Sequence, residues 1–233
     1  MNPTPVPKRR ALLIAPAEGC FMAVAMHDFL RSDAGGAWEA CETELLPARE
    51  RRRALDDFFL RARDCGTDYI LILFAGEFTS CGDDSILTLC AGEHVRLSEI
   101  KSAASFCAAM LMCDAGLDAG REPLRAPVSR STRSECRAAY DGALASLPPG
   151  MFVVAASDSC HSGDVSPCSY FAALLRAAAS CCDVMPVPQA SPVVFGAAYL
   201  HTLARGDIAQ LSSSQQPCMS GYSRSAQPPL AVG

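Results

Sequence analysis

Short apolar runs alternate along this chain with longer segments whose apolar residues recur at helical spacing, and this alternation constrains the fold most. Turn residues bound each run. Because parallel strands need long crossover connections, which are usually helical, the pattern predicts an α/β domain with a six-stranded, mostly parallel sheet. The predicted strands are residues 10–15, 41–46, 69–76, 108–116, 151–157 and 228–233.

Six helices are expected between and after these strands. In residues 48–66, Leu55, Phe58 and Phe59 form one apolar face, and the basic run Arg51–Arg53 is expected on the solvated outer face. The spacing of Thr132 and Glu135 is that of a capping box, so a helix begins there. The predicted helices are residues 21–31, 48–66, 97–106, 132–147, 169–182 and 192–206.

Length and composition exclude several classes of protein. The 233 residues, half of them hydrophobic, are enough for one sizeable core, so a single domain is expected over residues 1–233. The net charge of -5, with scattered Lys and Arg, argues against nucleic-acid binding. No apolar run approaches the roughly 20 residues that span a bilayer, so no membrane association is expected.

The 13 cysteines point to a reducing compartment. The apolar run near the N-terminus is too short for a signal peptide, so the cysteines are interpreted as reduced thiols of a cytoplasmic protein. Cys107 and Cys113 lie in apolar patterns where cysteine acts as a small hydrophobe. No Cys-x-x-Cys pair occurs and the acidic turn at Asp83 and Asp84 lacks an ion-loop pattern, so no metal or other cofactor is expected.

Two stretches compete for a catalytic position. "LMCDAGLDAG" ends an apolar run at Asp114 with a turn of small residues, but it offers no nucleophile after the acid. "ASDSCHSGD" follows a later run and offers Cys160 and His161 after Asp158. Which stretch lies at the site decides what chemistry is available, because a thiol beside an imidazole is the usual pair for nucleophilic catalysis.

The order of elements resembles that of caspases, metacaspases and bacterial caspase-type peptidases. The residues that carry the resemblance are "RALLIA", "GTDYILILFAGE", "DSCHSG" and the closing "QQPCMSG" with "PPLAVG". The resemblance implies a caspase-like three-layer sandwich, with residues 1–120 as the large-subunit part, 121–134 as a linker loop and 135–233 as the small-subunit part. It also implies a Cys–His dyad at the carboxyl edge of the sheet.

The sequence departs from this pattern at the dyad. The turn after the third predicted strand has Glu77 at the histidine position, and a carboxylate there raises a neighbouring thiol's pKa instead of lowering it. In one register Asp114-Ala115-Gly116 replaces the nucleophile turn, so Gly116 stands where the cysteine belongs. In the other, Cys160 is the nucleophile. Strand counting and the shorter separation from Glu77 favour Gly116.

Two functions stay open. The favoured one is a catalytically inactive caspase-like pseudoenzyme, a protein-binding or scaffold component that forms a homodimer or binds a partner through the closing strand, residues 228–233. A component of a larger assembly differs from it only in the partner. The alternative is a cysteine endopeptidase that uses Cys160 with His161 or another histidine, and Asp114 and Asp158 are candidates for its substrate pocket.

Overall fold

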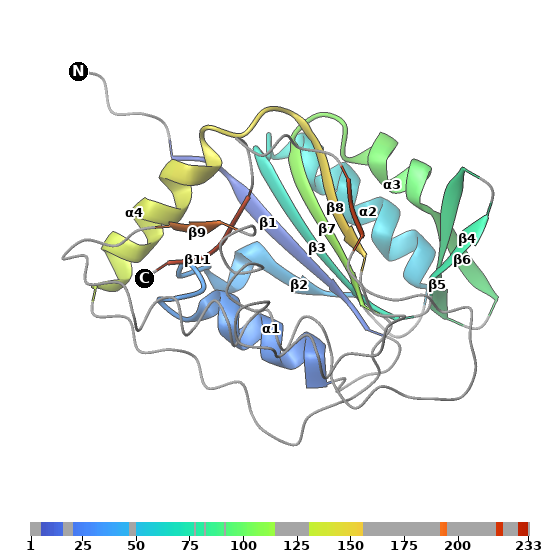
Figure 1. Cartoon of the computed structure of the whole chain (residues 1–233), viewed down its shortest axis with the longest axis horizontal. Helices are drawn as coiled ribbons and strands as arrows, with labels where there is room; N and C mark the ends of the chain where they lie inside the picture. The colour runs from blue at the N-terminus through green and yellow to red at the C-terminus, as the bar shows by residue number, and fades with distance from the viewer. Residues whose placement is uncertain are drawn as a thin grey trace.

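The fold is an α/β arrangement built around a mostly parallel sheet (Figure 1). The computed structural model describes part of the chain: residues 6–15, 21–46, 50–76, 78–81, 83–90, 92–114, 131–155, 192–194, 218–220 and 228–232. Five parallel strands form the sheet, and a short antiparallel strand, β10, extends it in the order β10-β8-β7-β3-β1-β2. The bounds are β1 (Arg9–Ile14), β2 (Thr43–Leu45), β3 (Tyr69–Ala75), β7 (Ala108–Asp114), β8 (Gly150–Ala155) and β10 (Cys218–Ser220).

Four α-helices of the described residues cover both faces of this sheet (Figure 1). One face packs on α2 and α3 through a core that includes Leu12, Phe58 and Ile100. The other face carries α1 and α4, and the buried Phe29, Trp38 and Tyr140 lie on this side. The helices are α1 (Phe21–Arg31), α2 (Arg51–Asp64), α3 (Leu97–Ala103) and α4 (Arg133–Leu144).

The central strands owe their positions to continuous apolar sequence. All seven residues of β3 are buried, as expected for a strand covered on both faces. Side chains alternate across the sheet, so one set of β3 residues faces α2 and the other faces α1. The α/β class and the mostly parallel sheet predicted from the sequence are confirmed, and the first five predicted strands all occur.

A second sheet was missed by the sequence prediction. Three antiparallel strands follow β3 in the order β4-β5-β6 and form a separate small sheet beside α2 and α3 (Figure 1). Their bounds are β4 (Phe78–Cys81), β5 (Asp84–Cys90) and β6 (Glu93–Arg96). Leu87, Leu89 and Val95 on its inner side are buried in the same core as α2 and α3, so this sheet is part of the folded domain.

The predicted closing strand is in the wrong place. Residues 228–233 were expected in the main sheet beside β8, but β11 (Pro229–Val232) pairs with β9 (Pro192–Val194) in a two-stranded sheet. The backbone N–H of Val232 also donates to the carbonyl of Ala34 at 2.7 Å. The place beside β8 belongs to β10, in a segment for which no strand was predicted from the sequence. A strand's partner depends on distant residues, which the local pattern does not encode.

Two other predictions are wrong. Residues 192–194 were assigned to a helix but form β9, since Val193 and Val194 are β-branched and suit a strand. Arg51 was expected on a solvated face, but it is 2% exposed and donates from Nη1 to the carbonyl of Leu89. This bond anchors α2 to β5, so the basic run is only partly a surface feature.

Candidate functional site

The carboxyl ends of β3, β7 and β8 lie side by side. Phe74, Cys113 and Ala155 form one row across these three parallel strands, and Ala75 pairs with Asp114 in the next row. Ligands of open α/β sheets bind outside this edge of the strands. The sequence segments that follow β3, β7 and β8 contain the predicted dyad positions, so this edge is the first candidate site.

Most of the predicted site residues fall beyond these strand ends. Asp114 is the last residue of β7, and the structure describes only its backbone. In sequence, Glu77 and Gly116 each come two residues after the last residue of their strand. Their roles, and the role of the alternative nucleophile, stay predictions. Outside the described residues are Glu77, Gly116, Asp158, Cys160 and His161.

The turn that leaves β3 is closely packed. A Cβ atom placed on Gly76 would lie 2.9 Å from Cζ of Phe74, closer than such atoms approach in proteins. A larger residue at position 76 would therefore displace the Phe74 ring, which is itself buried in the core. Glycine at this position lets the chain turn directly at the sheet edge.

Two cysteines, one near each end of β7, serve as core residues. Cys113 is 3% exposed and belongs to the core that α2 and α3 cover, which confirms the prediction made for it. Cys107 directly precedes β7 at its opposite end and is also 3% exposed, and burial raises its pKa to about 12. Burial and a raised pKa both disfavour the reactive thiolate, so Cys107 is typical of a core residue.

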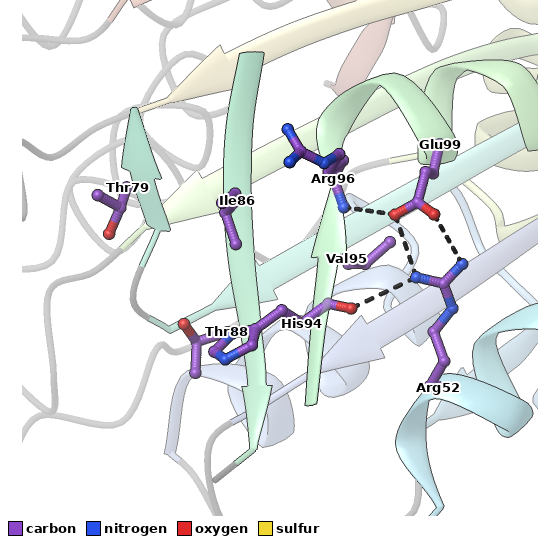
Figure 2. Close-up of a pocket in the computed structure, with 8 residues that line it drawn as sticks. All are labelled: Arg52, Thr79, Ile86, Thr88, His94, Val95, Arg96 and Glu99. Carbon is purple, nitrogen blue, oxygen red and sulfur yellow. Dashed lines mark hydrogen bonds and ion pairs between the residues drawn. The ribbon is translucent and has the colours of Figure 1, made fainter. Parts of the chain in front are cut away.

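A hollow of about 460 Å³ lies on the outer side of the small sheet, and it is the second candidate site (Figure 2). Registers place Thr79, Ile86 and Arg96 in one row across β4, β5 and β6. Thr88 and His94 form the next row. Since side chains alternate along each strand, these five share the face opposite to the buried Leu87, Leu89 and Val95.

An ion pair forms the rim of this hollow. Arg52 of α2 donates from Nη1 and Nη2 to the two carboxylate oxygens of Glu99 at 3.1 Å each, and from Nη1 to the carbonyl of His94 at 3.3 Å (Figure 2). Glu99 also accepts from the backbone N–H of Arg96 at 2.8 Å, which caps α3. These hydrogen bonds, with the Arg52 bond the largest cause, lower the pKa of Glu99.

The guanidinium of Arg96, unlike that of Arg52, forms no ion pair among the described residues. Figure 2 shows it directed away from the Arg52–Glu99 pair. The only carboxylate that lines the hollow is Glu99, which Arg52 already holds with both nitrogens. The Arg96 guanidinium feels the charges of Glu99 and Asp84 but forms a direct ion pair with neither, so its N–H donors can meet a ligand.

Sequence reasoning missed this hollow. The turn after β3 was interpreted as an acidic loop, although Leu87 and Leu89 alternate with Ile86 and Thr88 as in a half-buried strand. That alternation was the available signal. Arg52 could not have been separated from its neighbours by pattern alone, because only the packing of α2 decides which side of a basic run is covered.

A second group of charged residues is buried between β1, the short 3-10 helix η1 (Ala40–Glu42) and α4. Nη1 of Arg9 lies 3.0 Å from Oδ1 of Asp141, and Nε of Arg9 lies 3.5 Å from Glu42. Arg137 contacts both carboxylates, at 2.5 Å from Glu42 and 3.5 Å from Asp141. The Arg9 guanidinium also stacks 4.6 Å from the centre of the Trp38 ring. Such closed pairing is typical of a structural role.

The backbone beside this group is adapted to it. Gly36 has a φ of +95°, and a Cβ atom on it would lie 2.4 Å from Cδ2 of Tyr140. Both the conformation and the close approach require glycine here. The carbonyl of Gly36 accepts from Nη2 of Arg9 at 2.7 Å, so the same residue binds the buried guanidinium.

Neither metals nor relatives identify a function. Among the described residues, no group of three His, Cys, Asp or Glu side chains could hold a metal ion. No helix in that part of the chain is long and apolar enough to cross a membrane. No protein-family model matches the chain, and no curated protein matches it in sequence.

Proposed function

We propose that the chain is a caspase-like pseudoenzyme that acts by binding another protein, as a scaffold or as a component of an assembly. One observation carries the proposal: the carboxyl ends of β3 and β7 are hydrogen-bonded neighbours, and the sequence that follows each of them has neither histidine nor cysteine within two residues. Glu77 and Gly116 occupy the positions where the resemblance implies the dyad. A carboxylate and a glycine cannot generate a thiolate nucleophile.

The parallel strands and the two helical layers support this proposal. They bring the ends of β3, β7 and β8 to one edge, which is the arrangement that the resemblance implies for the reacting groups. A chain that keeps such a scaffold without the chemistry keeps surfaces on which another protein can bind. The outer side of the small sheet is such a surface, because its side chains are partly exposed around a hollow.

The competing proposal is a cysteine endopeptidase that uses Cys160 with His161 or another histidine. The observation that favours it is the position of Cys160, five residues after β8 ends at the same edge of the sheet. Against it, neighbouring side chains in a turn usually diverge, so His161 is poorly placed to activate the thiol next to it. The two proposals differ in the reactivity of one sulfur atom.

Site-resolved alkylation by iodoacetamide at pH 6, read by mass spectrometry, separates them. Three exposed thiols, Cys41, Cys65 and Cys81, give the reference rate, and the buried Cys107 and Cys113 give the slow limit. The pseudoenzyme predicts that Cys160 reacts no faster than the exposed references and that a mixed peptide library stays uncleaved. Rapid labelling of Cys160, with cleavage that disappears in Cys160→Ala, would contradict it.

A further inference from the structure

We infer that the hollow on the outer side of the β4-β5-β6 sheet binds an acidic side chain of a peptide segment in a partner protein. The inference rests on the proposed function, because it assumes that the chain acts by binding protein. It identifies which surface does so and which chemistry that surface recognises.

The charge of the lining selects an anion. Arg52, Arg96 and His94 line the hollow with one carboxylate, Glu99, which accepts both hydrogen bonds of the Arg52 fork. Asp84 lies outside the lining and interacts with Arg96 through its charge but forms no ion pair with it. Asp56 contacts Arg52 from the helix side at 3.4 Å. Arg96 is thus the cation left over within the hollow, and a planar guanidinium matches a carboxylate with two parallel N–H donors.

The remaining groups favour a peptide over a free ion. Ile86 of the middle strand, β5, pairs with Arg96 of β6. It offers apolar contact to the methylene groups of a Glu or Asp side chain. The hydroxyl groups of Thr79 and Thr88 are further donors on the same face. A hollow of about 460 Å³ has room for a side chain and part of its backbone.

The pocket is already organised for this task. Arg52 is fixed by Glu99 and by the carbonyl of His94, and Glu99 holds the backbone of Arg96. These bonds keep β6 and the start of α3 in place without using the Arg96 guanidinium. The backbone around the hollow therefore needs little ordering when a ligand binds, and only the Arg96 side chain has to be fixed. The chain as a whole is acidic, so attraction for an acidic peptide must come from this local group of cations.

The test uses acetylated hexaglutamate as the probe and hexaglutamine as its uncharged match, with ¹⁵N-labelled protein and amide chemical shifts as the readout. Hexaglutamate is expected to shift the amides of β4, β5 and β6, and hexaglutamine is not. Arg96→Gln should weaken binding about tenfold, and Arg96→Lys should restore part of it, since a single charge-assisted hydrogen bond has about this value. Arg53→Gln is the matched control, because Arg53 is exposed on α2 outside the hollow.

The inference would be overturned by equal binding of hexaglutamate by Arg96→Gln, by shifts confined to other parts of the chain, by shifts with inorganic phosphate but not with hexaglutamate, or by no hexaglutamate binding at all. If Arg96→Gln fails to fold, Thr88→Val and the dependence of the wild-type shifts on salt test the same point, since charge-assisted binding weakens as salt rises. If hexaglutamate does not bind and Cys160 is unreactive, the peptide site is wrong but the proposed function stands. A reactive, cleaving Cys160 overturns the proposed function whatever the peptide result.

Discussion

Two regions of the molecule pair arginine with carboxylates, and they do so under opposite conditions. The group between β1 and α4 is closed: the Arg9 side chain is 0% exposed and that of Asp141 is 8% exposed. At the small sheet, the side chains of Arg52 and Glu99 are 37% and 45% exposed, and Arg96 is left without an ion pair among the described residues. The same chemistry therefore holds the fold together in one region and is accessible to a partner in the other.

The largest expected effect comes from breaking the closed group. Asp141→Asn keeps the shape of the side chain but leaves the buried Arg9 guanidinium with Glu42 alone, at 3.5 Å. Removal of one partner from a buried ion pair typically costs about 3–5 kcal/mol, and Glu42 retains part of the pairing, so we expect a loss of about 3 kcal/mol in the free energy of unfolding. Urea denaturation measures it.

The matched control is the exposed pair between Glu44 and Arg61, at 2.7 Å. Glu44→Gln should lower the free energy of unfolding by less than about 1 kcal/mol, because solvent screens such pairs. Similar losses for the two substitutions would remove the distinction between the closed and the open region.

A smaller effect is expected where the closed region binds the two-stranded sheet. The hydroxyl of the buried Tyr140 donates to the carbonyl of Pro229 in β11 at 3.0 Å. Tyr140→Phe keeps the ring and removes this bond, so a loss of about 1 kcal/mol is expected by urea denaturation. Hydrogen exchange should become faster at the backbone amide of Val232, which donates to the carbonyl of Ala34. Unchanged exchange in β11 would show that this bond does not fix the strand.

The smallest effect is the response of the open region to acid. Hydrogen bonds from Arg52 and from the backbone of Arg96 lower the pKa of Glu99, and a bond from the Ser98 hydroxyl is the main cause of the lowered pKa of Asp84. A carboxyl whose folded pKa is lowered adds stability above its unfolded pKa of about 4.3 for Glu or 3.9 for Asp, and this is lost as pH falls through the folded pKa.

Hydrogen exchange in β6 and α3 should therefore quicken only below about pH 4.5, in the range where these carboxyl groups take up protons. Carboxyl chemical shifts of Glu99 measured across the titration check its pKa directly. In Glu99→Gln the part of the acid response that depends on Glu99 should vanish. A normal or raised pKa for Glu99 would contradict the hydrogen-bond geometry at the rim of the hollow.

The sequence predicted the centre of the fold better than its margins. Strands β3 and β7 are continuous apolar runs, which is the sequence pattern expected of strands that are buried on both faces. β10 and β11 are short, so their pairing is decided by residues far away in the chain. β5 was not predicted because only part of it is buried, so its apolar pattern is weaker than that of β3.

The candidate site was only partly predictable. The apolar runs and the turns after them predicted where β3 and β7 end. These ends lie next to each other because the two strands pair in parallel. The hollow at Arg96 requires α2 to place Arg52 against Glu99, which lies 47 residues later in the chain. Likewise Arg9 and Asp141 meet only because Asp141 of α4 lies beside the start of β1. The local sequence around Arg9 does not indicate that this side chain will be buried.

The most direct test of the proposed dyad positions is the alkylation rate of a thiol introduced by Gly116→Cys, measured at pH 6 with and without Glu77→His. If these are the two dyad positions, the imidazolium should lower the thiol pKa where the carboxylate raises it, so the double variant should react about tenfold faster or more. Equal rates in the single and double variants would contradict the proposal that positions 77 and 116 are the two dyad positions.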